Sequence, residues 1–305
     1  MSKKTSFLRY RLIINKIKVS PLSFEEIADY LEMESDIHGY DFNISKRTFQ
    51  RDLNDIRSIF SIDIQYDRNN KVYYIKEEYE PEMSEKILEA FDILNSLSAK
   101  QNLADIIHFE NRQSKGTNNL NGLIHAIKNE LKISFSYHKF NNKEAEKRSI
   151  CPYGIKEFRN RWYVIGYENP DKPLRIFALD RLKELVISDE KFKKPSDFNI
   201  HELFKNNFGV IITKENKPEE IILSFTNIQG KYIKTLPLHS SQEILIDNKK
   251  EFRIKLNLVI TNDFIIELLS MGENIKVIKP EKLKKRIKNI YSKALNNYSK
   301  DKKVK

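Results

Sequence analysis

The sequence predicts a multidomain α+β protein, and three changes of pattern along the chain indicate this fold class. Residues 1–78 show helical periodicity three times and then two short strand-like runs. Residues 119–195 consist mainly of strand-like runs separated by turn signals, which favours a small antiparallel β-barrel. Residues 218–300 alternate strands with helices and predict a smaller α+β module. With 305 residues and 40% hydrophobic composition, each part has enough apolar residues for a core.

The first part reads as three helices and a hairpin. Residues 7–18 place Leu8 and Leu12 at helical spacing, with Ile13 and Ile17 as further candidates for the buried face. A second helix begins at a capping box of Ser23 and Glu26 and is followed by a polar loop, ESDIHGYDFN. A third helix begins after the N-cap Ser45 and carries one apolar stripe: Phe49, Leu53, Ile56 and Phe60. Two strands around Asn69-Asn70 then complete the order of a winged helix-turn-helix.

In that architecture the last helix enters the major groove of DNA with its N-terminal residues on base edges. The residues predicted to read DNA there are Lys46, Arg47, Thr48, Gln50 and Arg51. On the wing, Arg68 and Lys71 are predicted to hold phosphate. Residues 1–78 carry 13 Lys/Arg and 13 Asp/Glu, so this prediction rests on pattern and not on net charge. Seven acids and no Lys or Arg lie between Val19 and Ser45, which separates the acids from the basic start of the third helix.

The formal net charge of +11 nevertheless makes an anionic partner plausible for the rest of the chain. Residues 118–215 have 18 Lys/Arg against 13 Asp/Glu, and residues 216–305 have 19 against 10. A single-stranded nucleic-acid-binding protein that uses these two basic modules therefore remains an alternative. Residues 79–118 are expected to form a helical linker, and residues 196–217 a connector.

The composition argues against several other classes. A lone cysteine, Cys151, excludes an internal disulfide framework and fits a reducing cytoplasm, and no apolar stretch is long enough to cross a membrane. Neither a phosphate-binding loop nor a dinucleotide glycine motif is present, so we predict no enzyme, catalytic residue, cofactor or metal. Pro170-Asp171 with Asp189-Glu190-Lys191 loosely matches the PD-(D/E)xK pattern of metal-dependent nucleases. Because ENPDKP is typical of a solvated hairpin turn, a nuclease is the less favoured alternative.

Arginines are interleaved with strand-type residues in RWYVIGYENPDKPLRIFALDRLKEL, residues 161–185. Trp162 and Val164 are expected in the core. Arg175 and Arg181 would share a strand face with Phe177 and Leu179, and arginines there need carboxylates, phosphates or water. A flat strand would separate the two arginines by about 20 Å, so a shared small anion requires a bent strand. Pairing with local acids such as Asp180 or Glu184 is the structural alternative.

This run resembles the signature of WYL-domain proteins, together with SFSYHKF and RSICPYGI before it and FKKPSDFN after it. The resemblance extends to the helix-turn-helix and to the last module, and so covers nearly the whole chain. It implies a bacterial or phage-related regulator with an Sm/SH3-like WYL barrel that senses a nucleotide or nucleic-acid ligand, and dimerisation through the C-terminal extension (218–300). Some relatives control phage-defence or DNA-damage genes. By matching position, the ligand face would contain Tyr137, His138, Arg148, Tyr163, Arg175 and Arg181.

The sequence departs from the family pattern at Val164 and at Ala178, where many members have another arginine. The predicted function is a sequence-specific transcriptional regulator, acting as a repressor and a homodimer on a double-stranded DNA operator. A ligand on the WYL domain would change the spacing of the two DNA-binding heads.

Overall fold

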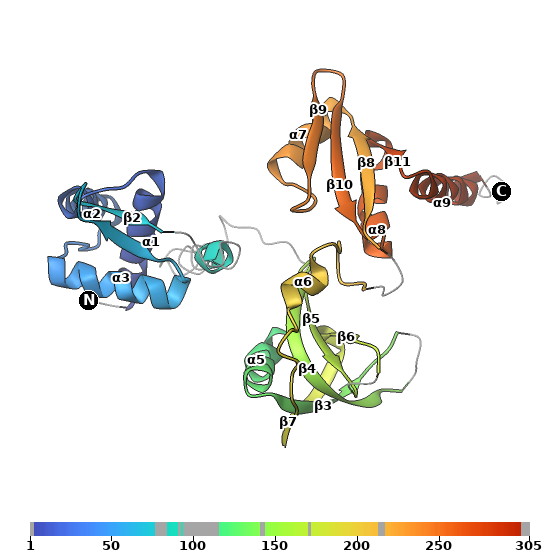
Figure 1. Ribbon diagram of the computed structural model, residues 1–305, viewed down its shortest axis with the longest axis horizontal. Helices are drawn as coiled ribbons and strands as arrows, with labels where there is room; N and C mark the ends of the chain where they lie inside the picture. Colours follow the sequence, from blue (N-terminus) through green and yellow to red (C-terminus); the bar gives the residue numbers. More distant parts are fainter. Residues whose placement is uncertain are drawn as a thin grey trace, which may run out of the picture. The chain divides into compact units, whose positions relative to one another are not determined.

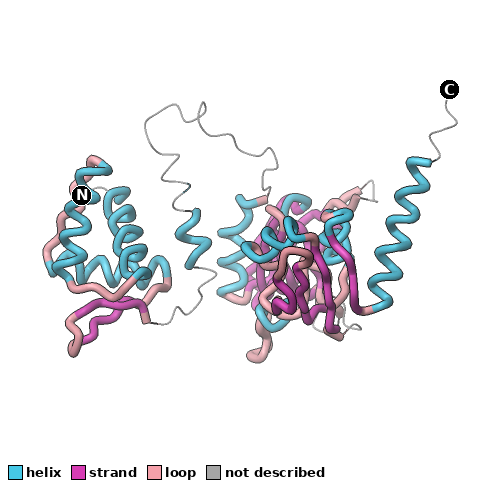
Figure 2. The backbone as a smooth tube through the Cα atoms, turned by 90° about the horizontal axis from the view of Figure 1, so that it is seen from above, coloured by secondary structure: helices cyan, strands magenta, loops and turns pink. Residues whose placement is uncertain are grey.

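A computed structural model describes residues 3–76, 84–90, 93, 116–140, 144–169, 172–212 and 217–299 (Figures 1 and 2). The chain divides into two compact units, residues 1–109 and residues 110–305. The fold is mixed α and β with several separate sheets, as the sequence predicts.

Residues 3–76 of the first unit form three helices and a two-stranded sheet (Figure 2). The elements are α1 (Lys3–Val19), α2 (Phe24–His38), α3 (Lys46–Phe60), β1 (Ile64–Asp67) and β2 (Val72–Ile75). The expected capping box is present at the start of α2, and the Ser45 side chain caps α3 by accepting from the Thr48 amide. Leu22, between α1 and α2, exchanges two backbone hydrogen bonds with Tyr73 and so adds a bridge to the hairpin. The predicted order of elements is therefore confirmed.

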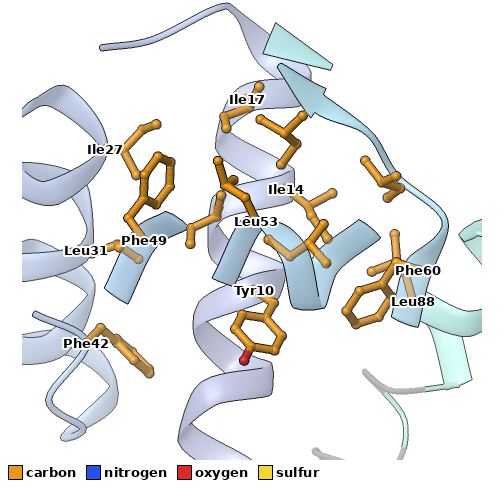
Figure 3. Packing of buried hydrophobic residues seen from close by; sticks show 14 residues of the cluster. Tyr10, Ile14, Ile17, Ile27, Leu31, Phe42, Phe49, Leu53, Phe60 and Leu88 are labelled. Carbon is orange, nitrogen blue, oxygen red and sulfur yellow. The ribbon is translucent and has the colours of Figure 1, made fainter. Parts of the chain in front are cut away.

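The core of this unit lies where the three helices meet (Figure 3). All four predicted stripe residues of α3 are buried, as the helical spacing requires. On α1 the buried face is centred on Tyr10, Ile13, Ile14 and Ile17, whereas Leu8 and Leu12 are only partly buried at its edge. The expected stripe on α1 was therefore rotated by part of a turn, because the apolar residues of this helix lie on more than one side of it and leave its periodicity ambiguous.

The prediction of a polar loop over residues 34–43 is wrong for the first half of that range. These residues are helical, because α2 continues to His38. The Ser35 hydroxyl donates to the Leu31 carbonyl at 2.8 Å and accepts from the Phe42 amide at 2.9 Å. Gly39 ends the helix in a left-handed conformation, with φ of 67°, which glycine adopts without strain. Phe42 is fully buried in the core and anchors the connection to α3.

A buried ion pair joins α1 to α3. Arg9 Nε and Nη2 donate to the two Asp52 carboxylate oxygens at 2.7 and 3.0 Å, and both side chains are 0% exposed. Burial raises the pKa of the Asp52 carboxyl, and the hydrogen bond from Arg9 opposes this shift. The next residue of α1, Tyr10, donates its hydroxyl hydrogen at 2.6 Å to Asp55, which lies about one turn after Asp52 on α3. These contacts fix the rotation of α3 about its axis relative to α1.

Residues 84–90 are helical and pack on the same unit. The Ser84 hydroxyl donates to the Phe60 carbonyl at 2.7 Å, Lys18 pairs with Glu85, and Leu88 is fully buried in the core. The remainder of the expected helical linker lies outside the described residues, apart from residue 93 and residues 116–118.

The second unit begins with a five-stranded antiparallel sheet in the order β6-β5-β4-β3-β7, coloured from green at β3 to yellow at β7 in Figure 1. Its elements are η2 (Thr117–Asn119), α5 (Leu120–Lys128), β3 (Leu131–Tyr137), β4 (Glu146–Phe158), β5 (Arg161–Tyr167), β6 (Arg175–Ala178), η3 (Leu179–Arg181) and β7 (Leu182–Lys191). The edge strands β6 and β7 are joined by the three residues of η3 alone, so the sheet is strongly curled. No ladder pairs these two fully described edges, and the expected closed barrel is therefore not confirmed.

The last part of the chain forms a four-stranded antiparallel sheet. After the short helix α6 (Ile200–Phe204) the elements are β8 (Glu219–Phe225), α7 (Asn227–Thr235), β9 (Glu243–Asp247), β10 (Phe252–Leu258), α8 (Asn262–Ser270), η4 (Gly272–Asn274), β11 (Ile275–Lys279) and α9 (Glu281–Ser299). The strand order β11-β8-β10-β9 with βαββαβ connectivity is the ferredoxin-like arrangement. The sequence indicated strands and helices here but not this topology.

Direct contacts join the two sheets of the second unit. The ring of Phe208, in the connection between them, contacts Phe158 of β4 and Phe264 of α8, each at 5.6 Å between ring centroids. The Asp263 carboxylate, at the start of α8, accepts from the amides of Val210 and Ile211 at 2.9 and 3.2 Å. The connection is therefore packed against both modules.

We predict that Asp52→Ala destabilises the first unit by about 3–5 kcal/mol, because it leaves the Arg9 guanidinium buried and uncompensated. The destabilisation should appear as faster amide hydrogen exchange in peptides from α1 and α3, measured on the full chain. Asp29→Ala, at an exposed position on α2, should change the protection by less than about 0.5 kcal/mol. Equal protection in both variants would show that the pair does not hold the helices together.

Candidate functional sites

The outer face of α3 carries polar side chains opposite the buried stripe. Arg47, Gln50 and Arg51 are exposed, and none of them has a side-chain hydrogen bond or ion pair to a described residue. At 100° per residue they lie on the side of the helix away from Phe49 and Phe60. Asn54 is exposed on the same face one turn further on, a position that the sequence argument missed although the spacing of three and four residues indicates it.

The other two residues of the predicted DNA-reading set make local contacts. Lys46 pairs with Glu25 of α2 at 3.0 Å, and its ammonium lies 5.3 Å from the Phe24 ring centroid. The Thr48 hydroxyl lies 3.1 Å from the Ser45 hydroxyl in the N-cap. The Lys46 side chain is 74% exposed, so it remains able to exchange Glu25 for an external anion.

The residues predicted to contact phosphate lie in the β1–β2 hairpin. Arg68 and Lys71 are both exposed in the turn between β1 and β2. The Asp67 carboxylate holds this turn by accepting from the amides of Asn69 and Asn70 and from the Asn70 side chain. The turn is thus ordered by its own hydrogen bonds, and the two cations point from a defined hairpin.

In the second unit, an arginine and two aromatic rings form the centre of the predicted ligand face. The guanidinium of Arg181 lies 5.0 Å from the Tyr137 ring centroid and 4.5 Å from that of Phe140. Its Nε atom is buried and has no hydrogen-bond partner among the described residues. The Tyr137 hydroxyl accepts from the Ala178 amide at 3.3 Å, and burial raises the pKa of this phenol. Phe140 is 75% exposed and was not among the ligand residues predicted from the sequence.

Charged groups of both signs lie beside this arginine. Asp180 pairs with Arg161 at 3.4 Å, while its other carboxylate oxygen is buried without a partner in the described part of the chain. Burial raises the pKa of Tyr163, and the charges of Arg161, Asp180, Asp263 and Arg181 also act on this phenol. Tyr137, Tyr163 and Arg181 therefore belong to one neighbourhood at the η3 turn.

Three other predicted ligand residues have different surroundings. Arg148 is held between two carboxylates, with a contact to Glu146 and a 2.6 Å hydrogen bond to Glu168. Arg175 is exposed on the edge strand β6, opposite Gly166, and His138 is exposed just after β3. No side-chain partner of Arg175 or His138 occurs among the described residues.

The single strand assumed for residues 175–181 does not exist, because β6 ends at Ala178 and the chain turns at η3. Phe177, Ala178 and Leu179 are consecutively buried, which strict alternation forbids. The two acids proposed as local partners bind elsewhere: Asp180 pairs with Arg161, and Glu184 accepts from the Ser136 hydroxyl at 2.8 Å. Of the expected core residues, Val164 is fully buried and Trp162 packs against the core while partly exposed.

Three of the four basic residues in the strands of the ferredoxin-like sheet pair with nearby acids, and no ion pair of the fourth, Lys276, occurs among the described residues. Lys255 pairs with Glu243, Lys279 with Glu220 and Arg253 with Glu251, at 2.6–2.8 Å. The aromatic residues of its four strands, Phe225 and Phe252, are both buried. This sheet therefore offers no exposed aromatic side chain on which a base of a single strand can stack.

Within the described ranges, no three His, Cys, Asp or Glu side chains are grouped to hold a metal ion. Pro170 and Asp171, half of the nuclease-like pattern, lie outside those ranges. Cys151 is buried, and burial raises the pKa of its thiol. No helix in the described residues is both long and apolar enough to cross a membrane.

Comparison with protein families identifies a WYL domain in residues 118–187. Among solved structures, the proteasome accessory factor B/C (PafBC) of Arthrobacter aurescens is similar, with 15% identity and a TM-score of 0.33 over 93% of this chain and 45% of that one. This chain thus spans less than half the length of PafBC. The crystal structure of a CRISPR Cas-related protein has 12% identity and a TM-score of 0.39 over 99% of this chain and 93% of that one. A comparison with curated proteins gives no match.

Proposed function

We propose that this protein is a sequence-specific DNA-binding transcriptional regulator that acts as a homodimeric repressor and senses an anionic ligand through its WYL domain. The proposed organisation is a winged helix-turn-helix (1–78), a helical linker (79–118), an Sm/SH3-like WYL sensor (119–195), a connector (196–217) and a dimerisation extension (218–300). The observation that carries the proposal is the arrangement of α3: its inner face is fixed to the core, while Arg47, Gln50 and Arg51 are exposed and have no partner among the described residues.

The DNA-binding step follows from the chemistry of that face. Arginine donates two parallel hydrogen bonds to guanine in the major groove, and glutamine makes the equivalent pair with adenine. Arg68 and Lys71 on the ordered wing turn are placed to contact phosphates, which fix the register without reading sequence. The bridge between Leu22 and Tyr73, which ties the hairpin to the start of α2, supports assigning this unit as a winged helix.

The ligand step centres on Arg181. Its guanidinium packs on Tyr137 and Phe140, and its buried Nε has no acceptor among the described residues, so an incoming phosphate would satisfy it. An exposed ring beside a guanidinium is also suited to stacking a base, which favours a nucleotide or an oligonucleotide. Arg148 already has two carboxylate partners and would have to exchange them for the ligand.

The dimerisation step is assigned to α7 and β9 of the extension. Ile228, Tyr232 and Leu236 follow one another at four-residue spacing and are 72%, 67% and 79% exposed. Ile228 and Tyr232 lie on the side of α7 opposite Gly230 and Ile233, which face the core, and Leu236 is the C-cap residue that follows the helix. The neighbouring edge strand β9 exposes Ile244 and Leu245 and has one unpaired edge. A second copy of this chain would cover both features through a two-fold contact.

Arg47→Ala should weaken binding to the operator by about 1–3 kcal/mol and relax base preference at one position, because a bidentate base contact is lost. Fluorescence anisotropy with duplex DNA from around the protein's own gene measures the effect. Lys249→Ala removes the same charge from an exposed turn of the second unit and should leave the affinity unchanged. Equal affinities for wild type and Arg47→Ala would reject α3 as the reading helix.

Arg181→Ala should abolish binding of a short single-stranded oligonucleotide, used as the phosphate-bearing probe, while operator affinity without the probe stays at the wild-type level. Arg175→Ala tests the second arginine, and a smaller loss is expected because Arg175 is exposed at the start of β6 and makes no contact with an aromatic ring among the described residues. Titration calorimetry gives both affinities. Undiminished probe binding by Arg181→Ala would move the sensor away from η3.

Tyr232→Glu should convert the dimer to a monomer, since it places a charge in the centre of the proposed apolar contact. Light scattering coupled to size-exclusion chromatography reports the mass. Ile266→Glu makes a comparable change at a 44% exposed residue of α8 and should leave the dimer intact. A dimer that persists in Tyr232→Glu would exclude α7 from the interface.

A further inference from the structure

The last helix, α9, has no role in the proposed function. Its first turns pack on the core of the extension through Leu283 and Ile287, which are buried, and the Tyr291 hydroxyl donates to the Gly272 carbonyl at 3.1 Å. The helix then continues for about two turns and projects away from the four-stranded sheet (Figures 1 and 2). From residue 291 to residue 299 every residue is exposed except Ala294, which is half-buried. The second half of α9 therefore leaves most of its surface open to a partner.

The charge of α9 is almost entirely of one sign. Its sequence contains six Lys or Arg residues and a single acid, Glu281. At 100° per residue, one stripe about 80° wide holds only cations and carboxamides, and it contains no acid and no apolar residue. This polar stripe of α9 runs for about 22 Å along the helix. Its members are all exposed: Lys282, Arg286, Asn289, Lys293 and Asn297.

Few contacts within the chain use the polar stripe. Lys282 contacts Glu219 of β8 and is 64% exposed, and Arg286 Nη2 donates to Asn262 Oδ1 at 3.4 Å, which is long for a hydrogen bond. For its other three members, no side-chain partner occurs in the described part of the chain. The cations of the four-stranded sheet differ, because three of those four pair with carboxylates at 2.6–2.8 Å. The stripe thus offers positive charge and hydrogen-bond donors that the described residues leave largely unused.

We propose that the polar stripe of α9 binds the phosphate backbone of duplex DNA, as a sequence-independent contact additional to α3. Lysine, arginine and asparagine side chains all donate hydrogen bonds to phosphate oxygens, and such contacts carry no sequence information. The phosphates of one DNA strand follow one another at about 3.4 Å along the duplex axis, so a stripe of about 22 Å can reach several of them. The contact raises the affinity for every duplex alike and leaves base preference to α3.

The stripe suits a duplex better than a single strand, because it contains no aromatic ring. Single strands are held in large part by the stacking of their bases on aromatic side chains. The two tyrosines of α9, Tyr291 and Tyr298, lie about 150° around the helix from the middle of the stripe. A strand whose phosphates lie on the stripe therefore finds no ring of α9 on which to stack its bases.

The salt dependence of duplex binding tests this proposal, because each neutralised phosphate contributes about −0.9 to the slope of log K against log salt concentration. Fluorescence anisotropy of the full chain measures the slope with two probes, the duplex from around the protein's own gene and a scrambled duplex of equal length. Arg286→Gln/Lys293→Gln should make the slope less negative by up to about 1.8 per chain and weaken binding of both duplexes by the same factor. Lys293→Gln alone should give about half of this change, and it replaces the double variant if that variant fails to fold.

The matched control is Lys284→Gln/Lys288→Gln, which removes two charges from the same helix on the side opposite the stripe. It should leave the slope close to the wild-type value. An unchanged slope in Arg286→Gln/Lys293→Gln, an equal change in the control, a loss confined to the operator, or tighter binding to a single strand would each overturn the proposal. The α3 assignment is judged separately, by the preference for operator over scrambled duplex, which Arg47→Ala should reduce and the α9 variants should leave unchanged.

Discussion

The buried pair between Arg9 and Asp52 is the contact on which the proposed DNA-reading surface depends. A fully buried ion pair contributes little net stability, because desolvation offsets most of the attraction, but its geometry is demanding. Two hydrogen bonds from one guanidinium to one carboxylate allow a single rotation of α3 against α1. That rotation buries Phe49 and Phe60. It leaves the side chains of Arg47, Gln50 and Arg51 exposed. An apolar contact at the same place would tolerate several rotations of the helix.

In the second unit, the proposed ligand site depends on the η3 turn, as the proposed DNA-reading surface depends on the pair between Arg9 and Asp52. The turn joins the two edge strands of the WYL sheet and carries both Asp180 and Arg181, so the proposed ligand would bind at the connection between these two edges. Tyr163, beside this turn, lies within the field of Asp263 at the start of α8. Asp263 also holds the connection between the modules through two backbone amides. In the proposed mechanism, ligand binding reaches the extension along this route, provided that the ligand binds the two states with different affinity.

Local patterns in the sequence were sufficient to predict the helices of the first unit, because the Ser23 cap and the stripe on α3 depend on neighbours within four residues. Features that depend on distant partners were not predictable in this way. From the sequence alone, Asp52 is expected at the surface. Its burial is explained by the pairing with Arg9, which lies 43 residues earlier in the chain. The same limit applied to the predicted ligand face. Glu168, one of the two carboxylate partners of Arg148, is brought near it by strand pairing, and the turn after Ala178 that ends β6 gives no signal in an alternating pattern.

The central claim is that α3 reads duplex DNA. Hydroxyl-radical footprinting of the full chain on the DNA around its own gene tests it most directly. The account predicts two protected half-sites related by two-fold symmetry, with major-groove contacts about one or two helical turns apart, as for other dimeric helix-turn-helix proteins. Uniform, sequence-independent protection, together with equal or tighter binding to single strands, would contradict the account.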